Sequence, residues 1–478
     1  MGSKASAKRA NAVSTPGGGA LPPAPPAYFL SLTVENVRCF GPKVELDFSH
    51  AHGRPAHWTV ILGDNGVGKT TLLQCLAALE ARIRTLPKTL TSAGLREAVP
   101  AINTWPIDWQ RGFLRGDGEV GAAINSVVGT GPRLAEQSTC CRRLPFGWTG
   151  SWVPPGLMDT SSDQRWGSIG GLKCYGYGAL RRMGESLLTS NGATDGALDE
   201  AVFGASKTLF REEAELINAE EWLARKDYAA AKGQSKAKEQ LEGVKELLLA
   251  VLPEDAVTDI RITSSTQHAD SAMVELQTPY GRVPLSKLSL GFQTVVAWMV
   301  DLAARLFERY PDSPNPLAEP AIVLVDEIDL HLHPRWQREI QSYLTQRFPN
   351  TQFIVTAHSP LVVQAAADAN IALLRQEGDH VVIDNDPATI KGWRVDQVLT
   401  SDLFGLPTAR SPEIERLFEE RAKLIQKKKR TKAQEQRLKV LDEIVESLPG
   451  AESPEDREAM EVIRKAAKRI RELEGEGS

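Results

Sequence analysis

A loop suited to phosphate binding lies between a predicted strand and a predicted helix. Its residues are Gly63, Asp64, Asn65, Gly66, Val67, Gly68, Lys69, Thr70 and Thr71. The glycines let successive backbone N–H groups approach a polyphosphate, because no Cβ atom blocks them. Lys69 adds a positive charge for the β- and γ-phosphates, and the Thr70 hydroxyl can bind Mg²⁺. The loop therefore predicts that the chain binds a nucleoside triphosphate.

The residues on either side of the loop predict the elements that hold it. Residues 58–62 form an apolar run, which is typical of a buried strand. The spacing of apolar side chains over residues 70–80 predicts a helix. The positive N-terminal end of that helix would face the phosphates.

Two adjacent carboxylates follow a second apolar strand far downstream. Residues 321–325 are apolar without alternation, which predicts a central parallel strand with both faces covered. Asp326 and Glu327 come next, at the end of the strand where open α/β sheets hold their ligands. We expect Asp326 to complete a magnesium site with Thr70, and Glu327 to orient or deprotonate the attacking water. The alternative is a solvated acidic turn, which the phosphate loop upstream disfavours.

A serine and a glycine stand at the start of another predicted helix. Ser289 and Gly291 lie within residues 288–293, and an apolar helix is predicted over residues 295–307. Such a helix start is a second anion-binding end. It could cap the γ-phosphate of a nucleotide that another subunit holds.

A histidine follows a third predicted buried strand, over residues 351–356. His358 at the carboxyl end of this strand could donate a hydrogen bond to the γ-phosphate. A single histidine in such a place more often has a structural role. The other motifs of this chain favour the ligand role for His358.

Together these segments resemble the ATP-binding-cassette (ABC) ATPases. Residues 63–71 match Walker A, residues 288–293 the signature, residues 322–327 Walker B, Asp329 the D-loop and His358 the switch histidine. Leu290 departs from the usual signature, and no Q-loop glutamine stands out. The resemblance implies an α/β P-loop NTPase fold of ABC type and the hydrolysis of ATP with Mg²⁺. It also implies that ATP is held between two copies, in a homodimer or a higher homo-oligomer.

The start of the chain is similar to one branch of that class. Residues 30–40 resemble the first strand and Asn-x-Arg-x-Phe turn of the SMC, RecF and OLD branch, whose ATP-contacting arginine maps to Arg38. Residues 175–182, 222–223 and 227–228 are similar to the ATPases of Septu and retron anti-phage defence. That resemblance implies a partner nuclease of HNH type on a separate chain.

Composition limits the possible partners and compartment. The formal net charge of −5 gives no global basic field, so any contact with nucleic acid would come from a local patch or through the partner. The 5 cysteines form no C-x-x-C pair. No apolar stretch has the length of a membrane span, and no secretory signal is apparent. We expect a cytoplasmic protein without membrane contact.

The pattern along the chain predicts five segments. They are a disordered tail (1–27), an N-terminal β-rich ATPase lobe (28–81), an insertion with an irregular Trp-rich part and a helical hairpin (82–255), a C-terminal ATPase lobe (256–390) and a charged helical extension for partner or self association (391–478). The extension includes the basic cluster 427–430, which is either a solvated helix junction or a DNA backbone contact.

The sequence argues against a nuclease site on this chain. Asp384 and Asp386 superficially match the paired aspartates of a Toprim domain. The alternating strands and helices of that domain do not follow them, so a hairpin turn is expected instead. No HNH cluster of histidines and asparagine is evident.

Two functions remain open after this comparison. The first is an ATP-dependent switch or sensor of an anti-phage defence complex that works with a separate nuclease. The alternative is a RecF-like DNA repair ATPase that clamps DNA directly. A transporter subunit is disfavoured by the SMC-like opening and the missing transporter-type helical subdomain.

Overall fold

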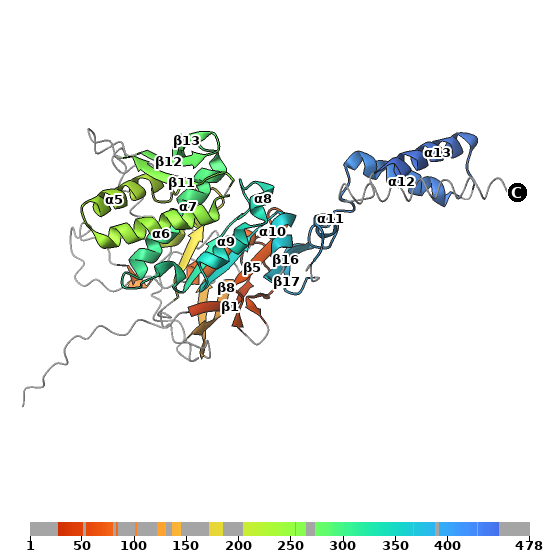
Figure 1. The fold of residues 1–478 in the computed structure, drawn as a ribbon. Helices are drawn as coiled ribbons and strands as arrows, with labels where there is room; N and C mark the ends of the chain where they lie inside the picture. The colour runs from red at the N-terminus through yellow and green to blue at the C-terminus, as the bar shows by residue number, and fades with distance from the viewer. Residues whose placement is uncertain are drawn as a thin grey trace, which may run out of the picture. The chain divides into compact units, whose positions relative to one another are not determined.

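The structure is a computed structural model in which two compact units, Met1–Phe404 and Gly405–Ser478, are recognised (Figure 1). It describes residues 27–50, 54–79, 83–84, 101–102, 122–130, 136–144, 172–184, 204–253, 255–263, 273–366, 368–387, 392–427 and 429–448. The expected disordered tail lies outside these residues, apart from Ala27, which is the first residue of a strand. The Trp-rich part of the expected insertion also lies largely outside them.

A six-stranded sheet forms the centre of the first unit, with the order β10-β14-β15-β5-β16-β17. Its strands are β10 (Cys174–Tyr177), β14 (Ala321–Val325), β15 (Thr351–Thr356), β5 (Trp58–Gly63), β16 (Asn370–Glu377) and β17 (His380–Asp384). All neighbours are parallel except β16 and β17. The three buried strands predicted from the sequence are confirmed.

Both faces of the central strands are buried, which explains why their sequences lack polar alternation. In β14, Val323 and Val325 face one hydrophobic core, and Ile322 and Leu324 face the other. None of these four side chains is exposed to solvent. The sheet is therefore the middle layer of a three-layer arrangement.

Helices cover one face of the sheet. They include α7 (Leu290–Arg309), α9 (Ile340–Arg347), α10 (Pro360–Ala365) and the predicted hairpin, formed by α5 (Ala219–Ala231) and α6 (Ser235–Val251). Gly233 has a φ of 88° and allows the chain to reverse between α5 and α6. By length and composition α7 could cross a membrane. However, 78% of its most apolar segment is buried inside the protein, as in the core helix of a globular domain.

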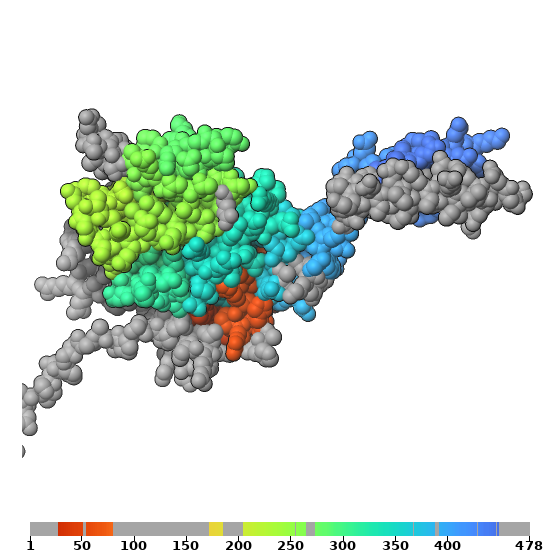
Figure 2. Space-filling view, viewed as in Figure 1, coloured from red at the N-terminus to blue at the C-terminus, as the bar shows by residue number. Residues whose placement is uncertain are grey.

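A three-stranded antiparallel sheet packs beside the hairpin. It consists of β11 (Asp259–Thr263), β12 (Met273–Thr278) and β13 (Gly281–Pro284). In Figure 2 this sheet and the α5–α6 hairpin form one continuous surface. The chain passes from β13 through a short 3₁₀ turn (Leu285–Lys287) into α7, so the sheet leads directly to the signature segment.

The other face of the central sheet is covered by α1 (Lys69–Leu79) and a four-stranded antiparallel sheet. The order of this sheet is β2-β1-β8-β9, with β2 (Val44–Asp47), β1 (Ala27–Glu35), β8 (Ala122–Thr130) and β9 (Glu136–Leu144). Apolar side chains of α1, such as Leu72 and Leu76, share a core with Phe29 and Leu32 of β1. The β-rich lobe expected at the N-terminus is therefore present.

The expected insertion over residues 82–255 differs from what the structure contains. β8 pairs with β1 of the N-terminal lobe, and β10 pairs with β14 of the C-terminal lobe. Among the described residues of this range, β8 and β10 therefore belong to the sheets of the two ATPase lobes. Only its helical hairpin matches the expectation. Short pieces in the rest are β6 (Ile83–Arg84), β7 (Ala101–Ile102), a 3₁₀ turn (Gly204–Ser206) and α4 (Lys207–Phe210).

The C-terminal extension begins later than residue 391. α11 (Val395–Leu399) belongs to the first unit, because Val398 and Leu403 are buried in its core and Gln364 donates a hydrogen bond to the Trp393 carbonyl. The second unit contains α12 (Pro412–Gln426) and α13 (Lys432–Ser447), which pack against each other. Arg437 forms an ion pair with Glu420 at 2.8 Å between these two helices.

The hairpin turn expected at residues 384–386 is also displaced. The hairpin that joins β16 to β17 lies at residues 378–379, and Asp384 ends β17. The Asn385 side chain then accepts a hydrogen bond from the Asp47 N–H and donates to the Glu45 carbonyl. These residues thus fasten the end of β17 to β2.

Candidate nucleotide-binding site

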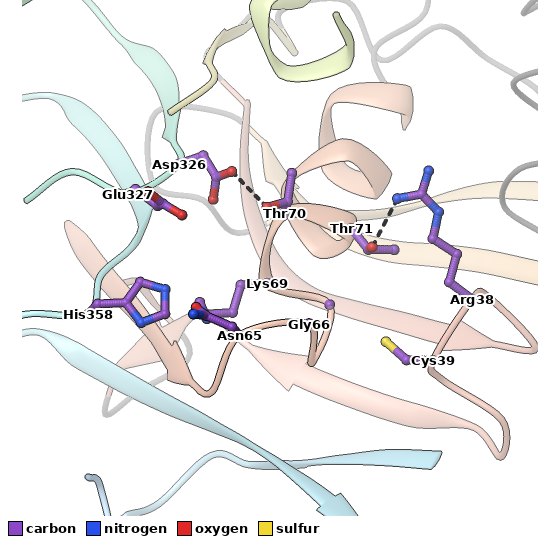
Figure 3. Close-up of a pocket in the computed structure, with 11 residues that line it drawn as sticks. Arg38, Cys39, Asn65, Gly66, Lys69, Thr70, Thr71, Asp326, Glu327 and His358 are labelled. Atoms are coloured by element: carbon purple, nitrogen blue, oxygen red, sulfur yellow. Dashed lines mark hydrogen bonds between the residues drawn. The ribbon is translucent and has the colours of Figure 1, made fainter. Parts of the chain in front are cut away.

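The order of the strands brings the distant motifs to one place. β15 lies between β5 and β14, and all three are parallel, so their carboxyl ends meet. A cavity of about 330 Å³ opens there. Its lining residues are Arg38, Cys39, Asn65, Gly66, Gly68, Lys69, Thr70, Thr71, Asp326, Glu327 and His358 (Figure 3). Every one of these except Cys39 is a site residue expected from the sequence.

At two positions of the glycine-rich loop, a positive φ coincides with a contact too close for a Cβ atom. Gly63 has a φ of 143°, and a Cβ atom there would lie 2.7 Å from the Leu374 carbonyl oxygen. Gly68 has a φ of 91°, and its Cβ would lie 2.4 Å from the Cys39 sulfur. Gly63, Asp64 and Val67 shape the loop without lining the cavity. Backbone groups at the exposed Gly66 remain open to a ligand.

Lys69 is folded back onto the loop. Its Nζ donates hydrogen bonds to the carbonyls of Gly63 at 2.8 Å and Asp64 at 2.7 Å, and the residue is only 6% exposed. Burial lowers the pKa of Lys69, and the nearby carboxylates, Asp326 first, oppose that shift. A polyphosphate would supply stronger acceptors for this ammonium group than two carbonyls do.

Thr70 and Asp326 meet across 256 positions of the sequence. The Thr70 hydroxyl donates to Asp326 Oδ2 at 2.7 Å, and the other carboxylate oxygen accepts from the Thr356 hydroxyl at 2.6 Å. Hydroxyl and carboxylate oxygens are the ligands that Mg²⁺ prefers. The pair therefore fits the donor set of a magnesium site, as the sequence predicts.

Glu327 stands in a left-handed conformation, with a φ of 48°. Its N–H donates to the Thr356 hydroxyl at 2.7 Å, and the half-buried residue lines the cavity next to Asp326. In Figure 3 the Asp326, Glu327 and His358 side chains stand opposite Lys69 and Thr70. Of the two carboxylates that line the cavity, Asp326 accepts the hydrogen bond from Thr70 and Glu327 does not.

His358 follows β15 and is exposed at the mouth of the cavity. Its backbone N–H lies 3.2 Å from both carboxylate oxygens of Asp329. Asp329 itself does not line the cavity. The structure therefore places Asp329 as a support for the loop of His358 within one protomer.

Arg38 lies on the other side of the cavity, in the turn after β1 (Figure 3). Its guanidinium donates to the Thr71 hydroxyl at 3.2 Å and to Gln74 Oε1 at 3.1 Å. Both partners lie in the first turns of α1, so Arg38 ties the turn to the helix that follows the loop.

The signature residues do not line the cavity of their own chain. Ser289 is exposed at the N-cap of α7 and makes no capping hydrogen bond. Gly291 is buried, and a Cβ atom there would lie 2.4 Å from the His331 carbonyl oxygen. The helix start is therefore held against the loop after Walker B while its serine faces solvent.

Sequence reasoning missed two supporting residues of the acidic pair. Thr356 holds the Asp326 carboxylate and the Glu327 N–H, and Arg181 donates to the carbonyl oxygens of both acidic residues. Burial lowers the pKa of Arg181 to about 10. The polar residue directly after the apolar run of residues 353–355 could have indicated Thr356. For Arg181 the sequence offers only the family resemblance of residues 175–182.

Comparison with known proteins agrees with this geometry. The family described as "AAA domain, putative AbiEii toxin, Type IV TA system" matches residues 184–364, and a further AAA domain family matches residues 31–87. The chain is 28% identical over 378 residues to Septu protein PtuA of Bacillus mycoides (strain KBAB4), covering 79% of this chain and 44% of that protein. It is 44% identical over 124 residues to Retron Ec83 probable ATPase of Escherichia coli, covering 26% of this chain and 23% of that protein.

These similarities support an ABC-type ATPase of the SMC, RecF and OLD branch. It spans less than half the length of the curated relatives it matches. Among solved structures, the SMC head domain from Thermotoga maritima is 14% identical, with a TM-score of 0.34, and the match covers 75% of this chain and 98% of that one.

Proposed function

We propose that this ABC-class ATPase binds ATP with Mg²⁺ in the cavity at the strand ends and hydrolyses it. The observation that carries this proposal is the 2.7 Å hydrogen bond between Thr70 and Asp326, which joins the phosphate loop to the acidic strand. Lys69 would bind the β- and γ-phosphates in exchange for its two carbonyl partners. Arg38 and Asn65, which line the cavity, would contact the nucleotide.

The side chains that line the cavity divide the catalytic roles among them. Thr70 and Asp326 would hold Mg²⁺, which would neutralise phosphate charge when bound. Glu327 orients or deprotonates the attacking water from the adjacent wall of the cavity. His358 donates a hydrogen bond toward the γ-phosphate from the cavity mouth. Positioning and electrostatic stabilisation then account for most of the rate.

We place Ser289 and Gly291 on the nucleotide of a second copy. The exposed N-terminus of α7 lies outside the cavity of its own chain, and its orphan N–H groups suit an anion. A nucleotide held between two protomers would thus join them, and hydrolysis would release them. The ATPase is therefore a homodimer or a higher homo-oligomer in its ATP-bound state.

The names of the relatives support a role in genome defence. Septu and retron systems are the context of the matched proteins. We infer that the chain is the switch or sensor subunit of an anti-phage complex whose cutting is done by a separate nuclease of HNH type. A RecF-like clamp that binds DNA directly is the alternative, and it needs no nuclease.

Turnover by the purified full chain tests the enzymatic part. We expect the wild type to release phosphate from ATP in the presence of Mg²⁺. This activity should be lost in Lys69→Ala and when a chelator removes the metal. A wild type that neither binds nor hydrolyses ATP would overturn the proposal.

Co-expression with an HNH protein encoded beside the gene tests the role in defence. A stable hetero-complex supports defence, whereas DNA binding by the ATPase alone supports the clamp.

A further inference from the structure

A buried cation supports the acidic pair from behind the cavity. Arg181 follows β10 and is 2% exposed. Its Nη1 donates to the Asp326 carbonyl at 2.5 Å and to the Gly178 carbonyl at 3.2 Å, and its Nη2 donates to the Glu327 carbonyl at 3.0 Å. One planar guanidinium therefore fixes two successive peptide groups of the Walker B turn.

Burying Arg181 in this way costs folding free energy, which suggests that the fixed geometry has a function. Among the described residues Arg181 forms no salt bridge, and its Nε has no hydrogen-bond partner. A buried cation that relies on carbonyl oxygens is less stable than one paired with a carboxylate. Arg181 also has a φ of 40°, a conformation that costs a non-glycine residue about 1 kcal/mol. Such strain is concentrated at functional sites.

The conformation of Glu327 explains what the arginine does. With a φ of 48°, Glu327 would relax to a right-handed or extended conformation if its peptide groups were released. Two contacts prevent this: the Thr356 hydroxyl accepts the Glu327 N–H at 2.7 Å, and Arg181 binds the Glu327 carbonyl at 3.0 Å. Relaxation would swing the carboxylate away from the cavity.

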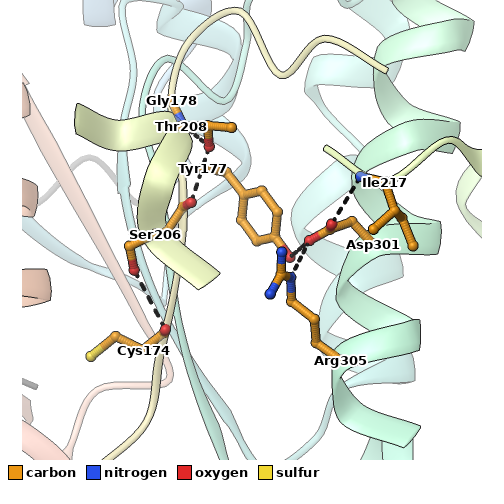
Figure 4. Close-up of polar contacts among 9 residues, drawn as sticks. Cys174, Tyr177, Gly178, Ser206, Thr208, Ile217, Asp301 and Arg305 are labelled. Carbon is orange, nitrogen blue, oxygen red and sulfur yellow. Dashed lines mark hydrogen bonds and ion pairs between the residues drawn. The ribbon is translucent and has the colours of Figure 1, made fainter. Parts of the chain in front are cut away.

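The same segment is bound to the signature helix. The Arg181 guanidinium lies over the Trp298 ring of α7, 5.7 Å from its centroid. Four residues earlier, the buried Tyr177 hydroxyl donates to the Asp301 carboxylate of α7 at 3.0 Å, and Arg305 pairs with that carboxylate at 2.7 Å (Figure 4). The Tyr177 carbonyl accepts from the Asp326 N–H at 2.8 Å. Residues 177–181 therefore connect α7 to both acidic residues.

We propose that Arg181 is a positioning residue for ATP hydrolysis, which holds Glu327 in its hydrolytic conformation and links that conformation to α7. The inference rests on the proposed ATPase activity. Arg181 touches neither the cavity nor a ligand, so its effect passes through the Walker B backbone. Movement of α7 when Ser289 engages the nucleotide of a partner would reach Glu327 through Trp298 and Tyr177.

Replacement by lysine tests the proposal, because lysine keeps the charge but cannot reach several carbonyl groups with one planar fork. In Arg181→Lys we expect kcat to fall about 10- to 100-fold, with the Kd for Mg-ATP within about threefold of wild type. The matched control is Arg182→Lys at the exposed neighbour, which should leave both constants unchanged. Equal losses in kcat and ATP affinity would show a general structural defect and overturn the proposal.

A double-mutant cycle adds a measurement that a structural role would not change. If Arg181 acts through Glu327, then adding Arg181→Lys to Glu327→Gln causes no further loss of kcat. If the double variant instead loses kcat by the product of the two single losses, the link between Arg181 and Glu327 is refuted. A wild type without ATP turnover would instead end the proposed function itself. If Arg181→Lys does not fold, Trp298→Phe decides: a loss of kcat of about twofold at unchanged Kd supports the link, and unchanged kcat refutes it.

Discussion

The backbone N–H of His358 is shared between the two carboxylate oxygens of Asp329, each at 3.2 Å. This contact joins the loop after Walker B to the loop after β15 within one protomer. It gives the D-loop aspartate a task that needs no second subunit. A residue expected to contact nucleotide is therefore also a support for the histidine that lines the cavity.

Replacement of Asp329 by alanine should loosen the His358 loop. We expect the free energy of unfolding to fall by about 1–2 kcal/mol, since a charged acceptor of a backbone N–H is lost. Turnover should fall several-fold while the Kd for ATP changes little. Urea denaturation and steady-state kinetics measure both effects. The exposed Asp312→Ala is the control, and a variant indistinguishable from it would contradict the supporting role.

The pH dependence of ATP binding should reflect Lys69. Burial lowers the pKa of Lys69 in the nucleotide-free protein, so its ammonium group loses its proton at a lower pH than an exposed lysine does. Phosphates would raise that pKa again, so binding takes up a proton and affinity falls as pH rises through the pKa of the free protein. Calorimetry in buffers of different ionisation enthalpy, between about pH 8 and pH 10, measures the uptake. Lys69→Arg stays charged over this pH range and should take up no proton at this position. If that variant takes up as many protons on binding ATP as the wild type, the uptake does not come from Lys69.

Glu327→Gln should bind ATP and fail to hydrolyse it. The amide has the same shape but cannot accept a proton from water, so kcat is expected to fall about 100-fold or more. The ATP-associated state should then persist, which sedimentation velocity with and without ATP detects. Glu308→Gln, on the exposed side of α7, is the control. Undiminished turnover in Glu327→Gln would remove this residue from the catalytic set.

Ser289→Arg should separate binding from association. The exposed N-terminus of α7 would carry a bulky cation where a partner's γ-phosphate is expected, so ATP-driven association and turnover should be lost. The Kd for ATP should stay near that of wild type, because the cavity of the same chain excludes Ser289. Ser286→Arg, exposed three residues earlier, should associate normally. Weakened ATP binding by the monomer would contradict the placement in trans.

The central strands and the phosphate loop could be predicted because burial leaves a direct trace in their sequences. β5, β14 and β15 are buried on both faces and rich in apolar residues, and glycine positions such as Gly63 tolerate no Cβ atom. The order of the strands could not be predicted in this way. Pairing between β10 and β14 joins residues almost 150 positions apart, and a four-residue strand with a central glycine gives no periodic signal.

The support of the site was hidden for a similar reason. Arg181 acts on carbonyl groups, which every residue has, so no side-chain pattern indicates its partners. The placement of Ser289 outside its own cavity also needs coordinates. Its chemistry could be predicted from a serine and a glycine at a helix start, but the sequence does not show which surface they face.

The position of β10 in the central sheet limits which fragments of the protein can be expressed alone. The stretch that matches the larger AAA family, residues 184–364, includes β14 but excludes β10 and β5. Expressed alone, that stretch would leave the apolar β14 without its outer neighbour, as an open template for pairing with other chains. We expect such a fragment to aggregate, so the smallest soluble piece must retain the segment that also carries Arg181.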